Sequence, residues 1–157
     1  MRHELIRRKA LLIDQFVEYY KRARGRKSFP HKEVGHLVTF LFSRSRFSGR
    51  GAFKTVYRID SKAKNLALKT SHFKSVTNDL RAYHRLPASI RNRYFAKVYW
   101  RTKYCSLQKF GTSAAVPDDV LKKLKGVGKK YRLTDIRSAN IRKVDGRFKI
   151  VDANLGR

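Results

Sequence analysis

The spacing of the apolar residues changes along this chain, and that change constrains the fold more than any other feature. Over residues 3–24 apolar side chains recur every three or four positions, which predicts an amphipathic helix that ends at Gly25. Pro30 begins a shorter helical pattern that continues to Leu41, although its second half would also suit a strand. From Arg44 onward the period is two, as in strands with one buried face.

Strand patterns and single helical patterns then alternate to the end of the chain. We expect a hairpin around the Gly49–Gly51 turn, a strand at 66–69, a helix at 75–86, strands at 95–100 and 104–110, a helix from Pro117, and a final hairpin at 141–151 turned by Asp145-Gly146. This order of elements predicts an α+β fold and argues against a doubly wound parallel sheet.

The chain is strongly basic throughout its 157 residues. It has 39 Lys and Arg against 11 Asp and Glu, a formal net charge of +28, and the excess is present in each of the segments 1–47, 48–115 and 116–157. Such a charge predicts a polyanionic partner, whereas the 41% of hydrophobic residues argues against a disordered basic tail.

Several classes of protein are excluded by what the sequence contains. Its single cysteine, Cys105, rules out a disulfide scaffold and a cysteine zinc site. Its apolar runs are shorter than the roughly 18 residues of a membrane span. We therefore expect a soluble cytoplasmic protein with no membrane partner.

Two fragments in the first strands are suited to binding phosphates. The turn at Gly49 and Gly51 would let backbone N–H groups approach phosphate oxygens, because glycine has no Cβ. Lys69 ends the apolar strand 66–69, where a lysine can contact phosphates. Asp79, on the next predicted helix, is a candidate partner for that lysine. Each fragment alone is weak evidence, since turn glycines and strand lysines are common.

A third fragment near the end of the chain carries the strongest chemical signal. Asp135 is followed five residues later by Asn140, then by the predicted hairpin, and then by Asp152. This order suits phosphoryl transfer, in which one carboxylate accepts the proton of a hydroxyl group. An amide oxygen and a second carboxylate then hold Mg²⁺ on the phosphates.

In these fragments, and over residues 45–157, the chain resembles the protein-kinase-like superfamily, and it looks closest to small atypical members such as RIO and aminoglycoside-phosphotransferase-like kinases. The resemblance implies ATP and Mg²⁺ as cofactors and assigns three groups of residues. These are catalytic Asp135 and Arg137, nucleotide-binding Gly49, Arg50, Gly51, Phe53, Val56, Lys69 and Asp79, and metal-binding Asn140 and Asp152.

The resemblance also implies a layout and an activity. We expect an N-terminal helical extension at 1–47, an N-lobe with a five-stranded antiparallel sheet at 48–111, and a strongly abbreviated C-lobe at 112–157. The implied activity is transfer of the γ-phosphoryl group of ATP to a hydroxyl, with a protein Ser or Thr as the expected acceptor.

The alternative is a catalytically weak kinase relative whose basic surface binds nucleic acid, a ribonucleoprotein or an acidic protein. A third interpretation, a helix-turn-helix DNA reader at 1–47, is weaker because its second helix is apolar where a recognition helix presents polar side chains. The sequence leaves open whether 1–47 supports the catalytic loop or mediates self-association.

Overall fold

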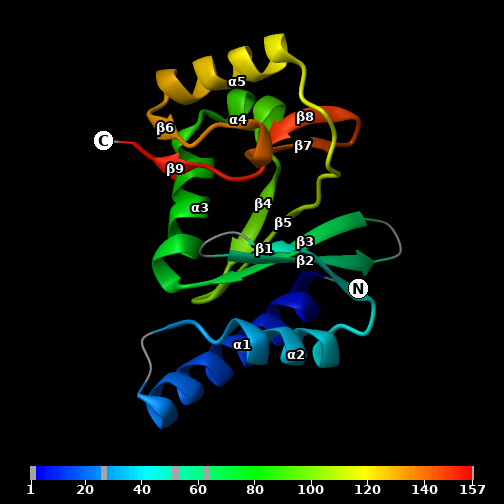
Figure 1. The fold of residues 1–157 in the computed structure, drawn as a ribbon, viewed down its shortest axis with the longest axis vertical. Coiled ribbons are helices and arrows are strands. Elements are labelled where there is room, and N and C mark those ends of the chain that lie inside the picture. Colours follow the sequence, from blue (N-terminus) through cyan, green and yellow to red (C-terminus); the bar gives the residue numbers. More distant parts are fainter. Residues whose placement is uncertain (1–2, 26–27, 51–53, 62–63, 157) are drawn as a thin grey trace. The chain divides into compact units, whose positions relative to one another are not determined.

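The two predicted N-terminal helices are present in the computed structural model, which describes residues 3–25, 28–50, 54–61 and 64–156 (Figure 1). Helix α1 (His3–Arg24) buries Ile6, Ala10, Ile13 and Val17, the predicted apolar stripe. It ends before Gly25, whose φ of 60° is the left-handed conformation that favours glycine at a helix end.

Helix α2 (His31–Leu41) follows Pro30, as predicted. The ambiguous segment in its second half is helical rather than extended. Val34 and Val38, four residues apart, are both fully buried, and only a helical period places them on one face.

The strands between residues 45 and 109 form one five-stranded sheet, which confirms the predicted α+β class and the antiparallel five-stranded sheet. Its strands are β1 (Ser45–Arg50), β2 (Lys54–Ser61), β3 (Lys64–Ser71), β4 (Val98–Arg101) and β5 (Cys105–Lys109). They are arranged in the order β1-β2-β3-β5-β4 (Figure 1). A bulge shifts the β1–β2 register between Phe47 and Gly49.

Helices α1 and α2 pack on this sheet and share its hydrophobic core. The core contains the buried faces of both helices together with Tyr57, Ile59, Leu66, Leu68 and Leu107 from the strands. The segment predicted as a helical extension is therefore an integral part of the packing of the sheet.

A buried carboxylate ties α1 to the turn between β4 and β5. Asp14 accepts hydrogen bonds from the Thr102 hydroxyl and from the backbone N–H groups of Lys103 and Tyr104, at 3.0, 3.0 and 2.9 Å. One turn further along α1, Glu18 accepts a hydrogen bond from the Tyr104 hydroxyl and pairs with Lys103. These polar contacts fix the register of α1 on the sheet.

The rest of the chain combines helices with two short strand pairs. Its elements are α3 (Phe73–Arg85), α4 (Ala88–Tyr94), α5 (Asp118–Lys130), β6 (Leu133–Thr134), the 3₁₀ turn η1 (Ser138–Asn140), β7 (Ile141–Val144), β8 (Arg147–Ile150) and β9 (Asn154–Leu155). The predicted Asp145-Gly146 turn joins β7 to β8, with φ of 51° and 78° at the two residues. Helix α4 and the β6–β9 pair were not predicted, and the strand expected from Phe95 begins at Val98.

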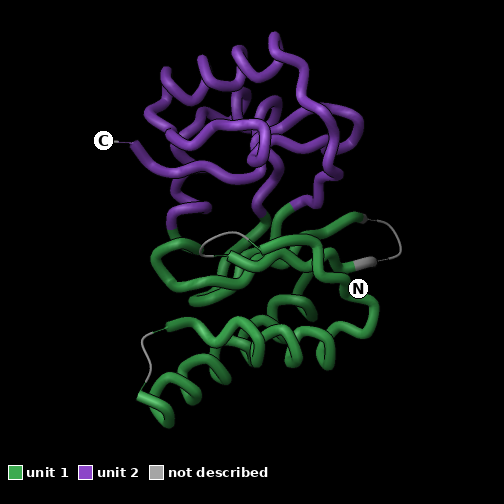
Figure 2. The backbone as a smooth tube through the Cα atoms, viewed as in Figure 1, with its two compact units in different colours: residues 1–77, 99–108 green, residues 78–98, 109–157 purple. Residues whose placement is uncertain are grey.

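The chain divides into two compact units, shown in Figure 2. Unit 1 comprises residues 1–77 and 99–108, and unit 2 comprises residues 78–98 and 109–157. The expected layout of 1–47, 48–111 and 112–157 stays a prediction, and in this division the N-terminal helices belong to the same unit as most of the sheet. Within the described part of the chain, no helix combines the length and apolarity needed to cross a membrane.

Candidate active site

The loop that follows β6 in unit 2 has an unusual backbone. Asp135 has a φ of 62°, and Arg132, just before β6, has a φ of 58°. Few residues other than glycine adopt this left-handed conformation, which costs free energy unless other contacts compensate, and aspartate is among those that adopt it more often. The Asp135 backbone therefore has to be stabilised by its neighbours.

Two side chains of the same loop hold Asp135. The amide nitrogen Nδ2 of Asn140 donates to the backbone oxygen of Asp135 at 2.8 Å and to its Oδ2 at 3.1 Å. The guanidinium Nε of Arg137 lies 3.1 Å from the other carboxylate oxygen, Oδ1. The Asp135 side chain is 36% exposed to solvent, so the carboxylate is accessible from outside the protein.

The segment that carries Asp152 runs beside this loop. The backbone N–H of Val151 donates to the backbone oxygen of Asn140 at 2.9 Å, and Asn154 pairs with Thr134 in the β6–β9 ladder. Half-buried Asp152 lies between these two attachment points. The structure thus brings three of the predicted residues, Asp135, Asn140 and Asp152, into one region of unit 2.

Close packing around the loop fixes its position. A Cβ placed on Gly128 of α5 would lie 2.7 Å from Ile136 Cγ1 and 3.2 Å from the backbone oxygen of Leu133, so the absence of a side chain allows α5 to approach the loop. Arg85 of α3 donates to the backbone oxygens of Arg132 and Gly156, at 2.8 and 3.0 Å.

Sequence reasoning missed both Gly128 and Arg85. Arg85 is one of many cations, and Gly128 resembles any helical glycine. The sequence holds no signal that would have singled out either residue.

In unit 1, three of the predicted nucleotide-binding residues lie in one row across the sheet. Gly49 on β1 is opposite Val56 on β2, and Val56 is opposite Lys69 on β3. Directly opposed residues of antiparallel strands share a face of the sheet, so all three point to the same side. A Cβ on Gly49 would meet no atom of the described residues within 4 Å.

The other predicted residues of this group are placed as follows. Arg50 is exposed at the end of β1, and Gly51 and Phe53 lie outside the described residues. Lys69 on β3 and Asp79 on α3 are both buried, with exposures of 6% and 4%. Lysine and aspartate are rarely buried to this extent unless they are paired.

The oxygen atoms of the unit 2 loop fit a hard cation such as Mg²⁺. Because Asn140 uses its amide nitrogen to hold Asp135, its carbonyl oxygen Oδ1 is the atom that can bind a cation. Among the described residues no group of three or more His, Cys, Asp or Glu forms a metal cluster. Mg²⁺ is usually bound by one or two carboxylates together with water and substrate phosphates, and Asp152 is the carboxylate that the resemblance assigns to such a site.

Comparison of the chain with models of known protein families and with curated proteins finds no match. The function of the site is therefore argued from its geometry and its chemistry.

Proposed function

We propose that this protein is an ATP- and Mg²⁺-dependent phosphotransferase that transfers the γ-phosphoryl group to a hydroxyl acceptor, expected to be a protein Ser or Thr. The observation that carries the proposal is the attachment of Asp135 to Asn140 beside the segment of Asp152. A general base next to two oxygen ligands is the arrangement that phosphoryl transfer requires.

Each residue of the unit 2 loop takes one role in the transfer. Asp135 accepts the proton of the acceptor hydroxyl while the new bond between that oxygen and the γ-phosphorus forms. The bond between the γ-phosphorus and the bridging oxygen breaks, and ADP leaves. Asp152 and Asn140 Oδ1 would hold Mg²⁺, which neutralises phosphate charge. Arg137 adds positive charge beside Asp135 that would stabilise the transferring group.

Unit 1 supplies groups for the phosphates of the nucleotide. Lys69 would contact the α- and β-phosphates, the role that the resemblance implies for it. The row formed by Gly49, Val56 and Lys69 supports this assignment, because it aligns the glycine turn with the lysine on one face of the sheet.

The test is incubation of the full chain with γ-labelled ATP and Mg²⁺, scored for autophosphorylation and for ATP turnover. Asp135→Asn is expected to lower transfer by about 10²-fold or more while ATP affinity stays nearly unchanged, because the base acts on the acceptor. Asp152→Ala is expected to abolish transfer. Asp145→Asn is the matched control, since it removes the same charge from a turn of unit 2 and should keep the rate within about twofold.

Nucleotide binding is measured separately by thermal shift. Millimolar ATP with Mg²⁺ is expected to raise the Tm by mass action, and Lys69→Ala should remove the shift. A parent protein with neither a shift nor transfer would overturn the proposal. A parent with a shift but no transfer would favour the catalytically weak relative instead.

A further inference from the structure

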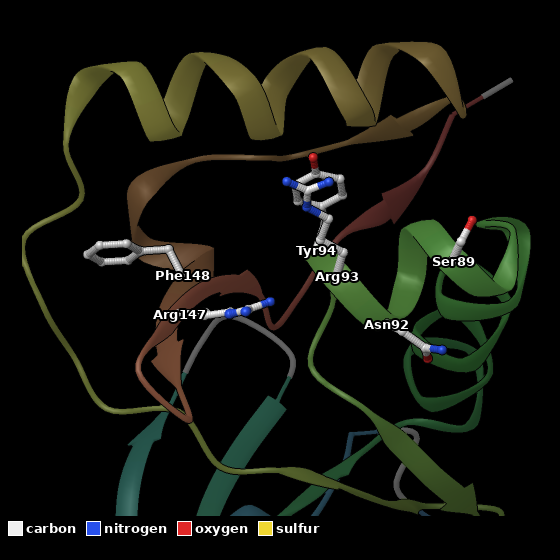
Figure 3. Close-up of a pocket in the computed structure, with 6 residues that line it drawn as sticks. All are labelled: Ser89, Asn92, Arg93, Tyr94, Arg147 and Phe148. Atoms are coloured by element: carbon white, nitrogen blue, oxygen red, sulfur yellow. The ribbon is translucent and has the colours of Figure 1, made fainter.

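Unit 2 contains a pocket of about 680 Å³ that the proposed phosphoryl transfer does not use (Figure 3). Its walls come from α4 and from the start of β8. The lining residues are Ser89, Asn92, Arg93, Tyr94, Arg147 and Phe148. The volume lies in the range of pockets that hold small ligands of nucleotide size.

Backbone pairing places α4 beside β8. Phe95, the residue after α4, forms a parallel bridge with Ile150, and the backbone N–H of Ala96 donates to the oxygen of Ile150 at 2.9 Å. Lys149 adds a second attachment, because its ammonium group donates to the backbone oxygen of Asn92 at 2.9 Å. The walls of the pocket are therefore held by the fold and do not depend on a ligand.

The pocket is suited to an anion. Every lining side chain is neutral or cationic, and the exposed Arg93 and Arg147 can each present two parallel N–H groups to a phosphate. Burial lowers the pKa of nearby Lys149, and the charges of Lys109 and Arg147 lower it further against the opposing effect of Asp145. A bound phosphate would offset this repulsion between cations.

The pocket also offers one aromatic surface. Tyr94 is half-buried, and the guanidinium of Arg93 and the ammonium of Lys123 lie 5.3 and 5.6 Å from the centre of its ring. In Figure 3 the ring of Phe148 extends away from the other lining side chains, whereas Tyr94 lies beside Arg93. Tyr94 also packs in part against the hydrophobic core of unit 2, so a flat ligand can contact only the part of its ring that these groups leave exposed. Aromatic side chains and arginine cations both contribute to base stacking in proteins that bind single strands.

We propose that this pocket binds one nucleotide unit of a single-stranded nucleic acid. Arg93 and Arg147 contact the phosphates, the base packs against Tyr94, and the side chains of Asn92 and Ser89 hydrogen-bond to the base or sugar. A nucleic acid fits better than a phosphopeptide because the charge of +28 extends over the whole chain, which suits a ligand with a charge on every unit. This proposal does not depend on phosphotransferase activity.

The test measures anisotropy of fluorescein-labelled, mixed-sequence 12-nucleotide RNA and DNA strands between 50 and 200 mM salt. Arg93→Gln with Arg147→Gln is compared with Arg44→Gln and Arg46→Gln, which remove two exposed arginines from unit 1. The pocket variant is expected to bind about tenfold more weakly than this control, with the salt dependence of log Kd reduced by about 1.4 for two lost phosphate contacts. All four arginines are exposed, so the Tm of both variants should stay near that of the parent.

Stacking on the ring is tested with Tyr94→Phe, which should bind like the parent, and with Tyr94→Leu, which should bind several-fold more weakly. Binding is measured well below the Tm of each variant, because Tyr94 also packs against the core of unit 2. Equal losses of affinity for RNA and for DNA in these variants support contacts to base and phosphate. Asp135→Asn should bind like the parent, which separates this site from phosphoryl transfer.

Three results would overturn the proposal. One is a pocket variant that loses no more affinity than the Arg44 and Arg46 control. Another is a duplex that binds as tightly as the single strand with the same dependence on Tyr94. The last is a serine phosphopeptide that binds more tightly than the oligonucleotides and depends on Arg93 and Arg147.

Discussion

The side-chain amide of Asn140 makes two hydrogen bonds to Asp135, one to its backbone oxygen at 2.8 Å and one to its carboxylate Oδ2 at 3.1 Å. One side chain thereby holds both the left-handed backbone of Asp135 and the direction of its carboxylate. It does so through nitrogen alone, and the amide oxygen is the atom that would bind the proposed Mg²⁺. The contact with Asp135 and the proposed metal role can therefore be separated by experiment.

Asn140→Asp keeps an oxygen ligand but removes the N–H donors to Asp135 and adds a like charge beside its carboxylate. We expect phosphoryl transfer to fall by about tenfold or more, and the free energy of unfolding to fall by about 1 kcal/mol. Transfer assays across Mg²⁺ concentrations and urea unfolding measure the two effects. Asn154→Asp on β9 makes the same chemical change at an exposed position and serves as control. Equal effects of the two substitutions would show that the bonds to Asp135 do not matter.

We expect alanine substitutions at two glycines of α5 to change the free energy of unfolding in opposite directions. A Cβ on Gly126 meets no atom within 4 Å, so Gly126→Ala should raise the free energy of unfolding by about 0.5–1 kcal/mol through helix propensity. Gly128→Ala should lower it, because the new Cβ would lie 2.7 Å from Ile136 Cγ1 and push α5 from the Asp135 loop. Urea unfolding of both variants checks this. Stabilisation by Gly128→Ala would mean that the loop adapts to the larger residue.

The three hydrogen bonds accepted by Asp14 predict a large cost for its removal. Asp14→Ala leaves two backbone N–H groups and a hydroxyl in the β4–β5 turn without their acceptor, so the free energy of unfolding should fall by about 2–4 kcal/mol. Glu4→Ala on the same helix loses only an exposed ion pair with Arg8 and should cost less than about 1 kcal/mol. Chemical denaturation that finds similar values for the two would refute the anchoring role of Asp14.

Two histidines of unit 1 predict a loss of stability in mild acid. Burial lowers the pKa of His31 and of His72 below the ordinary 6.5, with further lowering by Arg50 and His72 at His31 and by Lys21 at His72. Between each lowered pKa and 6.5 the unfolded chain binds more protons than the folded protein. The free energy of unfolding should therefore be highest above pH 6.5 and decrease as the pH falls below it.

Tm values measured between about pH 5.5 and 8 test this expectation. The variant His31→Gln with His72→Gln should show a weaker dependence on pH than the parent. An equally steep decrease in that variant would assign the effect to other groups.

The elements that the sequence predicted correctly depend on local chemistry. The stripe of α1 and the left-handed Gly25 after it are both visible within a few residues. The Asp145-Gly146 turn is equally local, since it needs only two residues that tolerate positive φ. Helix α4 gave no such signal, because it has seven residues, none of them buried, and so lacks an apolar period.

The sequence by itself also determined the basic character of the chain and the order of the residues that the resemblance assigns to phosphate and metal binding. Tertiary structure alone decided what these residues contact. Asp14 and Tyr104 are 90 positions apart, yet they meet because α1 packs on the sheet. The Asp152 segment lies beside Asn140 only through pairing of β6 with β9 and the bond from Val151. Contacts between distant positions depend on how the elements pack. The apolar periodicity of one segment does not show which other segment packs against it.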